Sequence, residues 1–265
     1  MSQMIPIAID GLKVEVPYDT SLLAAAAKLG IRIPTMCHNE NVKAYGVCRV
    51  CMVEVDEGRK KRLVPSCVYT VRSPISVSTK NDKVRNARRW ILEFMLARSP
   101  NESAVRDLAA EYGLDAPHPR LMPEADANVV RFERAPDRSR YFDESACILC
   151  GLCVRVCDEI VGANAIAFEG RGVERRVTTP FNEENEACIA CGACEAACPT
   201  KCIGFIDTGG VRELVRWKKK TNMIACEICG NWFMPESLAR VYRESMNIPE
   251  SVYKQCTDCR KSVFA

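Results

Sequence analysis

Cysteine is the residue type that most constrains this chain, because sixteen of its seventeen cysteines fall into four groups of four. In chain order the groups are Cys37, Cys48, Cys51 and Cys67; Cys147, Cys150, Cys153 and Cys157; Cys188, Cys191, Cys194 and Cys198; and Cys226, Cys229, Cys256 and Cys259. Four converging thiolates are what a tetrahedral metal ion or an iron–sulfur cluster requires. The sequence therefore predicts a row of metal sites, which is most simply a path for electrons.

Disulfides are the alternative use of so many cysteines, and the N-terminal sequence argues against them. MSQMIPIAID is neither a secretory leader nor a twin-arginine leader, and no apolar run reaches the roughly 18 residues of a membrane span. We expect a reducing cytoplasm in an anaerobe or facultative organism, without membrane insertion. The basic patches Arg59–Arg62 and Lys218–Lys220 lack interleaved aromatic residues, so we expect no nucleic-acid partner.

The two middle groups are the strongest signal, because both read Cys-x2-Cys-x2-Cys-x3-Cys, 41 residues apart. In two-cluster ferredoxins the fourth cysteine of such a run ligates the other cluster. We therefore expect two [4Fe–4S] clusters with exchanged fourth ligands. The expected sets are Cys147, Cys150, Cys153 with Cys198, and Cys188, Cys191, Cys194 with Cys157. Zinc is the alternative metal here, and a doubled run of this form disfavours it.

The first group lies in a segment that predicts an α+β ferredoxin domain of the β-grasp type over residues 1–80. A hairpin is expected first, then an alanine-rich helix capped by Thr20 or Ser21, then further strands around a cysteine loop. The expected strands are Ile5–Ile9, Leu12–Val16, Met52–Val55, Leu63–Pro65 and Ile75–Ser78, and the expected helix is Leu22–Leu29.

A helical segment and linker are expected over residues 81–140, followed by a two-cluster ferredoxin-like domain over 141–210. Asn81 can cap a helix to about Arg98, and Ser99–Glu102 reads as a capping box that opens another. A small hairpin of Ala165–Phe168 and Arg175–Thr178 is expected near the clusters.

The last group predicts a module over residues 211–265 that resembles a zinc ribbon. Its cysteines form two Cys-x2-Cys pairs, and Gly230 directly after the first pair suits a tight turn. A helix is expected over Pro235–Met246. Structural zinc is the favoured content, with a further iron–sulfur cluster as the alternative.

Two features carry a resemblance to a known group of proteins. They are the first four cysteines, which follow Pro34-Thr35-Met36 with spacings x10, x2 and x15, and the run from Cys147 to Cys157. Over Ile5–Ser99 and Tyr141–Phe205 the chain resembles the iron–sulfur region shared by three proteins. These are the large peripheral-arm subunit of complex I, iron-only hydrogenases and the small diaphorase subunit of bidirectional NAD-linked hydrogenases. The resemblance implies a [2Fe–2S] cluster on the first four cysteines.

The chain departs from this pattern between its ferredoxin segments. Those relatives usually place a His-x3-Cys-x2-Cys-x5-Cys site there, whereas residues 99–146 hold only His118 and no cysteine. We therefore expect that cluster to be absent, and no catalytic domain in these 265 residues. Cys202 is expected to be a buried residue rather than a ligand, and His38 a surface residue that forms a hydrogen bond.

The resemblance implies an electron-transfer subunit of a soluble hetero-oligomeric oxidoreductase linked to NAD(P)H, with no substrate site of its own. One partner would be a flavoprotein subunit of the complex I type that binds FMN and NAD. The other would be a catalytic subunit of a hydrogenase, a formate dehydrogenase or a flavin-based bifurcating reductase. Two alternatives stay open: an iron–sulfur subunit of the fumarate-reductase type, and a zinc-binding adaptor or nucleic-acid-binding protein without a redox role.

Overall fold

The structure is a computed structural model that describes residues 3–116, 146–245 and 248–261. Among these residues the chain forms two compact units, one of residues 3–116 and 146–152 and the other of residues 153–245 and 248–261. Most of the expected linker, together with His118, lies outside the described residues.

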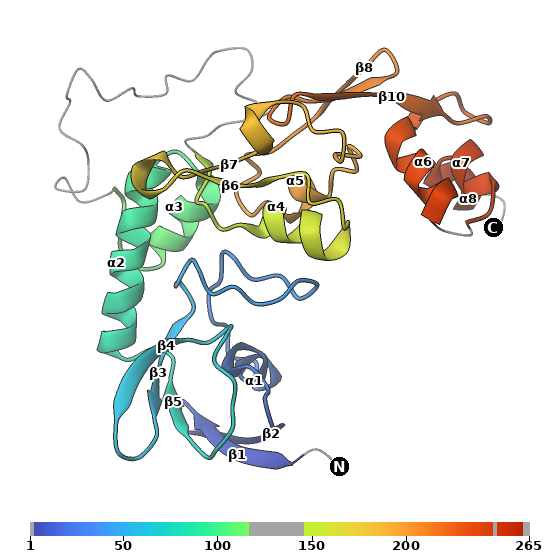
Figure 1. The fold of residues 1–265 in the computed structure, drawn as a ribbon. Coiled ribbons are helices and arrows are strands. Elements are labelled where there is room, and N and C mark those ends of the chain that lie inside the picture. Colours follow the sequence, from blue (N-terminus) through green and yellow to red (C-terminus); the bar gives the residue numbers. More distant parts are fainter. Residues whose placement is uncertain (1–2, 117–145, 246–247, 262–265) are drawn as a thin grey trace, which may run out of the picture. The chain divides into compact units, whose positions relative to one another are not determined.

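The first unit is built on a five-stranded mixed sheet with strand order β2-β1-β5-β3-β4 (Figure 1). Its strands are β1 (Met4–Ile9), β2 (Leu12–Pro17), β3 (Met52–Asp56), β4 (Lys61–Pro65) and β5 (Ser76–Ser78). Strand β1 pairs parallel with β5, and the other neighbours are antiparallel. The helix α1 (Leu22–Lys28) follows the first hairpin. The hairpin, helix and later strands expected from the sequence are all present.

Alternating apolar residues explain which face of the sheet is buried, and a capping side chain explains where α1 begins. Successive strand residues face opposite sides, so Ile5, Ile7 and Ile9 all enter the core. Ser21, one of the two expected caps, accepts a hydrogen bond from the Ala24 amide at 3.2 Å. The core extends to two of the expected ligands. It consists of Ile5, Ile7, Ile9, Val16, Leu22, Ala25, Ala26, Ile33, Cys51, Val53, Val55, Val64, Cys67, Val71, Ile75 and Val77.

Two further helices complete this unit, and the second begins later than expected. Asn81 caps α2 (Asp82–Arg98), but α3 runs over Ser103–Ala110 with Glu102 at its N-cap and no capping side chain. The expected capping box at Ser99 is therefore wrong. The reason is that Ser99 still belongs to the end of α2, where its amide donates to the carbonyl of Met95 at 2.8 Å.

The second unit begins with the helix α4, which starts at Leu152 and ends at Arg155, and a one-turn π-helix η3 follows it. Next come β6 (Ala167–Glu169), the 3-10 turn η4 (Gly172–Glu174), β7 (Arg176–Thr178), the 3-10 turn η5 (Pro180–Asn182) and α5 (Ala193–Ala197). Strands β6 and β7 form the expected hairpin, with bounds shifted by up to two residues. The helix α5 packs on η3 (Val156–Ile160), which brings Cys157, the last cysteine of the first run, close to the second run.

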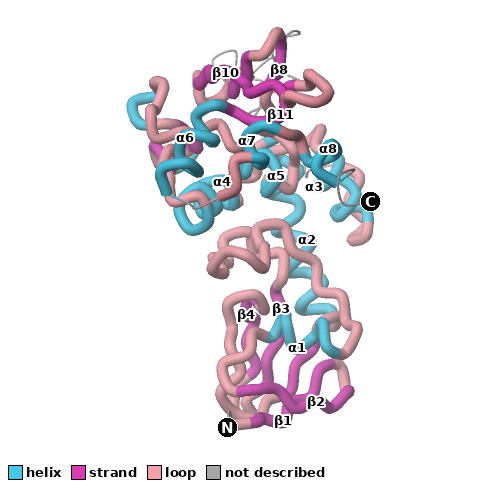
Figure 2. Tube along the Cα trace, turned by 90° about the vertical axis from the view of Figure 1, so that its right-hand side faces the viewer, coloured by secondary structure: helices cyan, strands magenta, loops and turns pink. Residues whose placement is uncertain are grey.

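A four-stranded sheet with order β11-β10-β9-β8 continues this unit (Figure 2). Its strands are β8 (Ile206–Thr208), β9 (Val211–Leu214), β10 (Lys219–Ala225) and β11 (Trp232–Pro235). The helices α6 (Glu236–Ser245) and α7 (Ser251–Lys254) pack on β10, and α8 (Thr257–Lys261) follows. The expected helix over Pro235–Met246 is confirmed over Glu236–Ser245 as α6, whereas Pro235 ends β11 and Met246 lies outside the described residues. The sheet itself was not expected, because the sequence around β9 and β10 reads as a basic segment.

Hydropathy adds one finding about the described ranges. None of their helices combines the length and the apolar character that crossing a membrane requires.

Candidate iron–sulfur and metal sites

The first cysteine group is buried at the end of the sheet, in the long loop between α1 and β3 and just after β4. Cys37, Cys48, Cys51 and Cys67 are each at least nine-tenths buried. The Sγ atoms of Cys51 and Cys67 are 3.4 Å apart, and the Cys48 amide donates to Cys37 Sγ at 3.5 Å. Four buried thiols from one loop and one strand end suit a small cluster, which needs four such ligands.

The electrostatics of this group reflects the contact between Cys51 and Cys67. The hydrogen-bonding contact between the Cys51 and Cys67 thiols, as the largest cause, lowers the pKa of Cys51 to about 6. The same contact, with burial and the nearby Cys37 and Cys48, raises the pKa of Cys67. Four buried thiolates in one region repel one another, so a positively charged metal centre would relieve the repulsion.

The second unit contains a small, mostly apolar pocket whose walls include four cysteines. Cys157 from η3 lines it together with Cys188, Cys191 and Cys194 from the loop that leads into α5. The other lining residues are Val161, Ala163, Ala165, Ile166, Ile189, Ala190, Gly192, Ala193, Leu214 and Trp217. Cysteines from both runs thus line one space, which is the arrangement that a reciprocal two-cluster ferredoxin needs.

The two cysteine runs also share an unusual backbone. Leu149 and Ala190, each just before the second cysteine of its run, both have positive φ (53° and 54°). Gly151 and Gly192, each just after it, have φ of 72° and 80°. Two left-handed residues flanking one cysteine are rare, so the runs are repeats in conformation as well as in sequence.

The remaining cysteines of the two runs, which are Cys147, Cys150, Cys153 and Cys198, are assigned to one cluster by the sequence alone. The carbonyl of Cys147 accepts a hydrogen bond from Arg98 Nε at 2.8 Å, which ties the start of the run to the end of α2. Cys198 Sγ lies 3.6 Å from Cys202 Sγ, and the Cys202 thiol lowers the pKa of Cys198 to about 5. Cys202 is buried, as expected.

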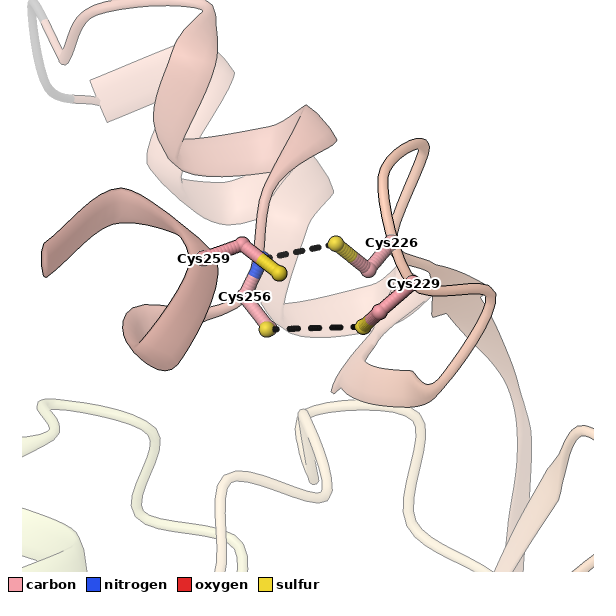
Figure 3. Close-up of side chains that lie close together, drawn as sticks. All are labelled: Cys226, Cys229, Cys256 and Cys259. Carbon is pink, nitrogen blue, oxygen red and sulfur yellow. Dashed lines mark hydrogen bonds between the residues drawn. The ribbon is translucent and has the colours of Figure 1, made fainter. Parts of the chain in front are cut away.

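The last group forms a four-cysteine site (Figure 3). The Sγ atoms of Cys226, Cys229, Cys256 and Cys259 all lie within 4.8 Å of one another. The first pair is in the turn between β10 and β11; Cys256 directly precedes α8 and Cys259 lies within it. The Cys256 amide donates to Cys226 Sγ at 3.3 Å and, as the largest cause, lowers the pKa of Cys226 to about 6. Such a site can hold one tetrahedral metal ion.

Trp217 is a residue at these sites that the sequence did not single out. It is 1% exposed, and its indole Nε1 donates to Cys194 Sγ at 3.5 Å. No local motif marks it, because it follows Cys194 by more than twenty residues and reaches it through the β9–β10 turn. His38 also differs from expectation. It is half-buried, and among the described residues its Nδ1 has no hydrogen-bond partner.

Comparison with known proteins assigns both ferredoxin segments to families. Residues 2–82 match a 2Fe-2S iron-sulfur cluster binding domain, and residues 146–202 match a 4Fe-4S dicluster domain. The chain thus contains a [2Fe–2S] domain and a [4Fe–4S] domain. The C-terminal four-cysteine site lies outside both matches.

Two curated relatives match most of this chain. The chain is 38% identical to the NADPH-Fe(3+) oxidoreductase subunit alpha of Geobacter sulfurreducens, over 98% of this chain and 31% of that protein. It is 31% identical to the NADH-ubiquinone oxidoreductase 75 kDa subunit of Reclinomonas americana, over 68% of this chain and 27% of that one. The expected resemblance is confirmed. This chain carries the iron–sulfur region of such oxidoreductase subunits.

The chain is also similar to a solved structure. The chain is similar to a chain of the NAD+-reducing [NiFe]-hydrogenase in the H2-reduced state, with a TM-score of 0.54 and 26% identity. The match covers 66% of this chain and 74% of that one. By contrast, the chain spans less than a third of the length of the two curated relatives.

Proposed function

We propose that this chain relays single electrons between a flavoprotein subunit and a catalytic subunit of a multi-subunit oxidoreductase linked to NAD(P)H. The observation that carries the proposal is the pocket in which Cys157 meets Cys188, Cys191 and Cys194. Because these ligands come from both runs, the pocket supports two [4Fe–4S] clusters with exchanged fourth cysteines.

Three clusters and one further metal would then be bound. We infer a [2Fe–2S] domain of the β-grasp type over residues 1–80, a helical segment and linker over 81–140, and a domain with two [4Fe–4S] clusters over 141–210. The proposed ligands are Cys37, Cys48, Cys51 and Cys67 for [2Fe–2S]; Cys147, Cys150, Cys153 and Cys198 for one [4Fe–4S]; and Cys157, Cys188, Cys191 and Cys194 for the other.

Residues 211–265 would form a separate zinc-binding module that resembles a zinc ribbon. Its proposed ligands are Cys226, Cys229, Cys256 and Cys259. Zinc is favoured because the four Sγ atoms already lie within 4.8 Å of one another around a single point, with one pair in a turn and the other at a helix start. A further iron–sulfur cluster is the alternative that metal analysis would reveal.

The clusters supply the one-electron chemistry, and the protein sets how readily each accepts an electron. Amide and indole N–H groups that donate to cysteine sulfur stabilise negative charge there, as at Cys37 and Cys194. Burial of the thiols keeps water away, and it strengthens each such hydrogen bond because the local dielectric constant is low. No bond of a substrate is made or broken in this function.

The partners follow from the relatives that share the iron–sulfur region. An NADH-ubiquinone oxidoreductase subunit and a chain of an NAD+-reducing hydrogenase both match, so we infer a flavin-containing partner that exchanges electrons with NADH or NADPH. A reductase or hydrogenase subunit would stand at the other end of the path, in a cytoplasmic hetero-oligomer. The Geobacter relative makes an Fe(3+)-reducing complex one candidate.

Metal analysis of anaerobically purified protein tests the proposal. We expect about ten iron, matching acid-labile sulfide and about one zinc per chain, with EPR signals of both cluster types after dithionite reduction. About fourteen iron without zinc would keep the electron path and replace the zinc site by a cluster. Zinc without iron would contradict the electron-transfer function and favour a zinc-binding adaptor.

A further inference from the structure

The buried indole of Trp217 gives the second [4Fe–4S] site a hydrogen-bond donor from outside the ferredoxin segment. Its Nε1 lies 3.5 Å from Sγ of Cys194, one of the four cysteines of the pocket. The indole N–H can only donate, and at 1% exposure it cannot turn to water. The cysteine sulfur is therefore its acceptor. We propose that Trp217 is a positioning residue that acts through Cys194 to raise the reduction potential of the cluster in this pocket.

The turn that carries Trp217 is anchored on both sides, so its indole is held in place. Arg216 donates to the carbonyl of Val177, and Lys218 donates to that of Asn182. Lys219, the first residue of β10, forms an ion pair with Glu184 at 2.8 Å. All three contacts join the β9–β10 turn to the segment that precedes Cys188, and they fix the donor relative to the cysteine loop.

The direction of the effect follows from charge. One-electron reduction adds one negative charge to the cluster, and this charge spreads onto the ligand sulfurs. A hydrogen bond from an N–H dipole stabilises that charge more than it stabilises the oxidised form, so it raises the reduction potential. The buried pocket strengthens the effect, because few water molecules compete with or screen the dipole. The guanidinium of Arg216 lies 5.0 Å from the centre of the indole ring, and its positive charge should also raise the reduction potential.

The inference rests on the proposed function, since it requires a cluster at Cys157, Cys188, Cys191 and Cys194. Its rival is that Trp217 serves only as packing around the pocket. Packing depends on the shape of the ring, whereas tuning depends on the N–H group. A change that keeps the shape and removes the N–H separates the two roles.

The test is an EPR-monitored redox titration of the full-length, anaerobically purified chain. We expect Trp217→Phe to shift the midpoint potential of one [4Fe–4S] signal to a more negative value. The other two clusters should titrate as in the unchanged protein, and iron per chain should be the same. Trp90→Phe is the matched control, because Trp90 is 57% exposed on α2 and should shift nothing.

Phenylalanine is smaller than tryptophan, so a second variant guards against loss of the cluster or entry of water. In a Trp90→Phe, Trp232→Phe background, biosynthetic replacement of the remaining tryptophan by benzothienylalanine puts sulfur where Nε1 was and keeps the ring shape. The same negative shift is expected. An unchanged potential in this variant, with iron content retained, would overturn the inference. If the unchanged protein holds no iron, the proposed function fails instead.

Discussion

At the scale of single residues, the structure gives different surroundings to two cysteines that are close in the sequence, Cys191 and Cys202. Cys191 faces the four-cysteine pocket, whereas Cys202 lies outside it, beside Cys198. Both cysteines lie in one short segment. In the sequence they differ only in that Cys191 belongs to the Cys-x2-Cys-x2-Cys-x3-Cys run and Cys202 follows it. The positions of their side chains lead to different expectations for iron binding.

Replacing Cys191 with alanine should remove one cluster. We expect iron per chain to fall by about four, because a cubane that loses one thiolate ligand is poorly held. The matched control is Cys202→Ala, which should keep iron and acid-labile sulfide at the level of the unchanged protein. Equal iron loss in the control would make Cys202 a ligand, and full iron in Cys191→Ala would contradict the assignment of the pocket.

At the scale of elements, one contact in each unit joins secondary-structure elements that are distant in the sequence: α2 with β3, and the β8–β9 turn with β11. In the first unit Arg88 of α2 is 5% exposed and donates to the Met52 carbonyl of β3 through Nε and Nη2, at 3.0 and 2.7 Å. In the second, the β8–β9 turn passes beneath Trp232 of β11. Neither contact can be seen in the sequence, because each joins residues more than twenty positions apart.

Arg88→Met should destabilise the first unit by about 2 kcal/mol, because it removes charged hydrogen bonds to the partly buried carbonyl of Met52. The loss should appear as a lower midpoint in urea unfolding, followed by circular dichroism of the cluster-loaded protein. Asn86→Met, at an exposed position of the same helix, is the control and should change the midpoint little. Equal shifts of the midpoint in both variants would show that the Arg88 hydrogen bonds do not contribute to the stability of the unit.

Gly210→Ala should destabilise the four-stranded sheet more than Gly209→Ala. Both glycines have positive φ, so both variants carry the cost of a left-handed alanine, about 1 kcal/mol. A Cβ at Gly210 would also meet Trp232 at 2.8 Å, whereas one at Gly209 meets nothing within 4 Å. Thermal unfolding should therefore give a lower midpoint for Gly210→Ala. A larger loss in Gly209→Ala would contradict the packing of Trp232 on this turn.

At the scale of the whole molecule, the C-terminal module has a small core of its own. That core consists of Met234, Ala239 and Tyr253 with six partly buried neighbours. A core of this size gives little stability, and metal ions commonly make up the difference in such modules. The four-cysteine site joins the β10–β11 turn to α8, so it closes the module at its end.

Replacing Cys229 and Cys259 together with serine should abolish metal binding at this site and loosen α6, α7 and α8. We expect about one zinc per chain to be lost, and amide hydrogen exchange in these helices to speed up by at least about tenfold. Iron should stay at about ten per chain, since the clusters use other cysteines. Unchanged exchange would mean that the module folds without metal. A fall of about four iron would identify a cluster in place of zinc.

Sequence spacing alone determined much of this protein. The doubled cysteine run predicted two clusters, and alternation with capping residues predicted the first five strands, α1, α2 and α6, because these signals are local. Only the tertiary structure revealed the β8–β11 sheet, the late start of α3 and the N–H of Trp217 at Cys194. These features depend on contacts between residues far apart in the chain, and such contacts leave no periodic or motif-like trace in the sequence.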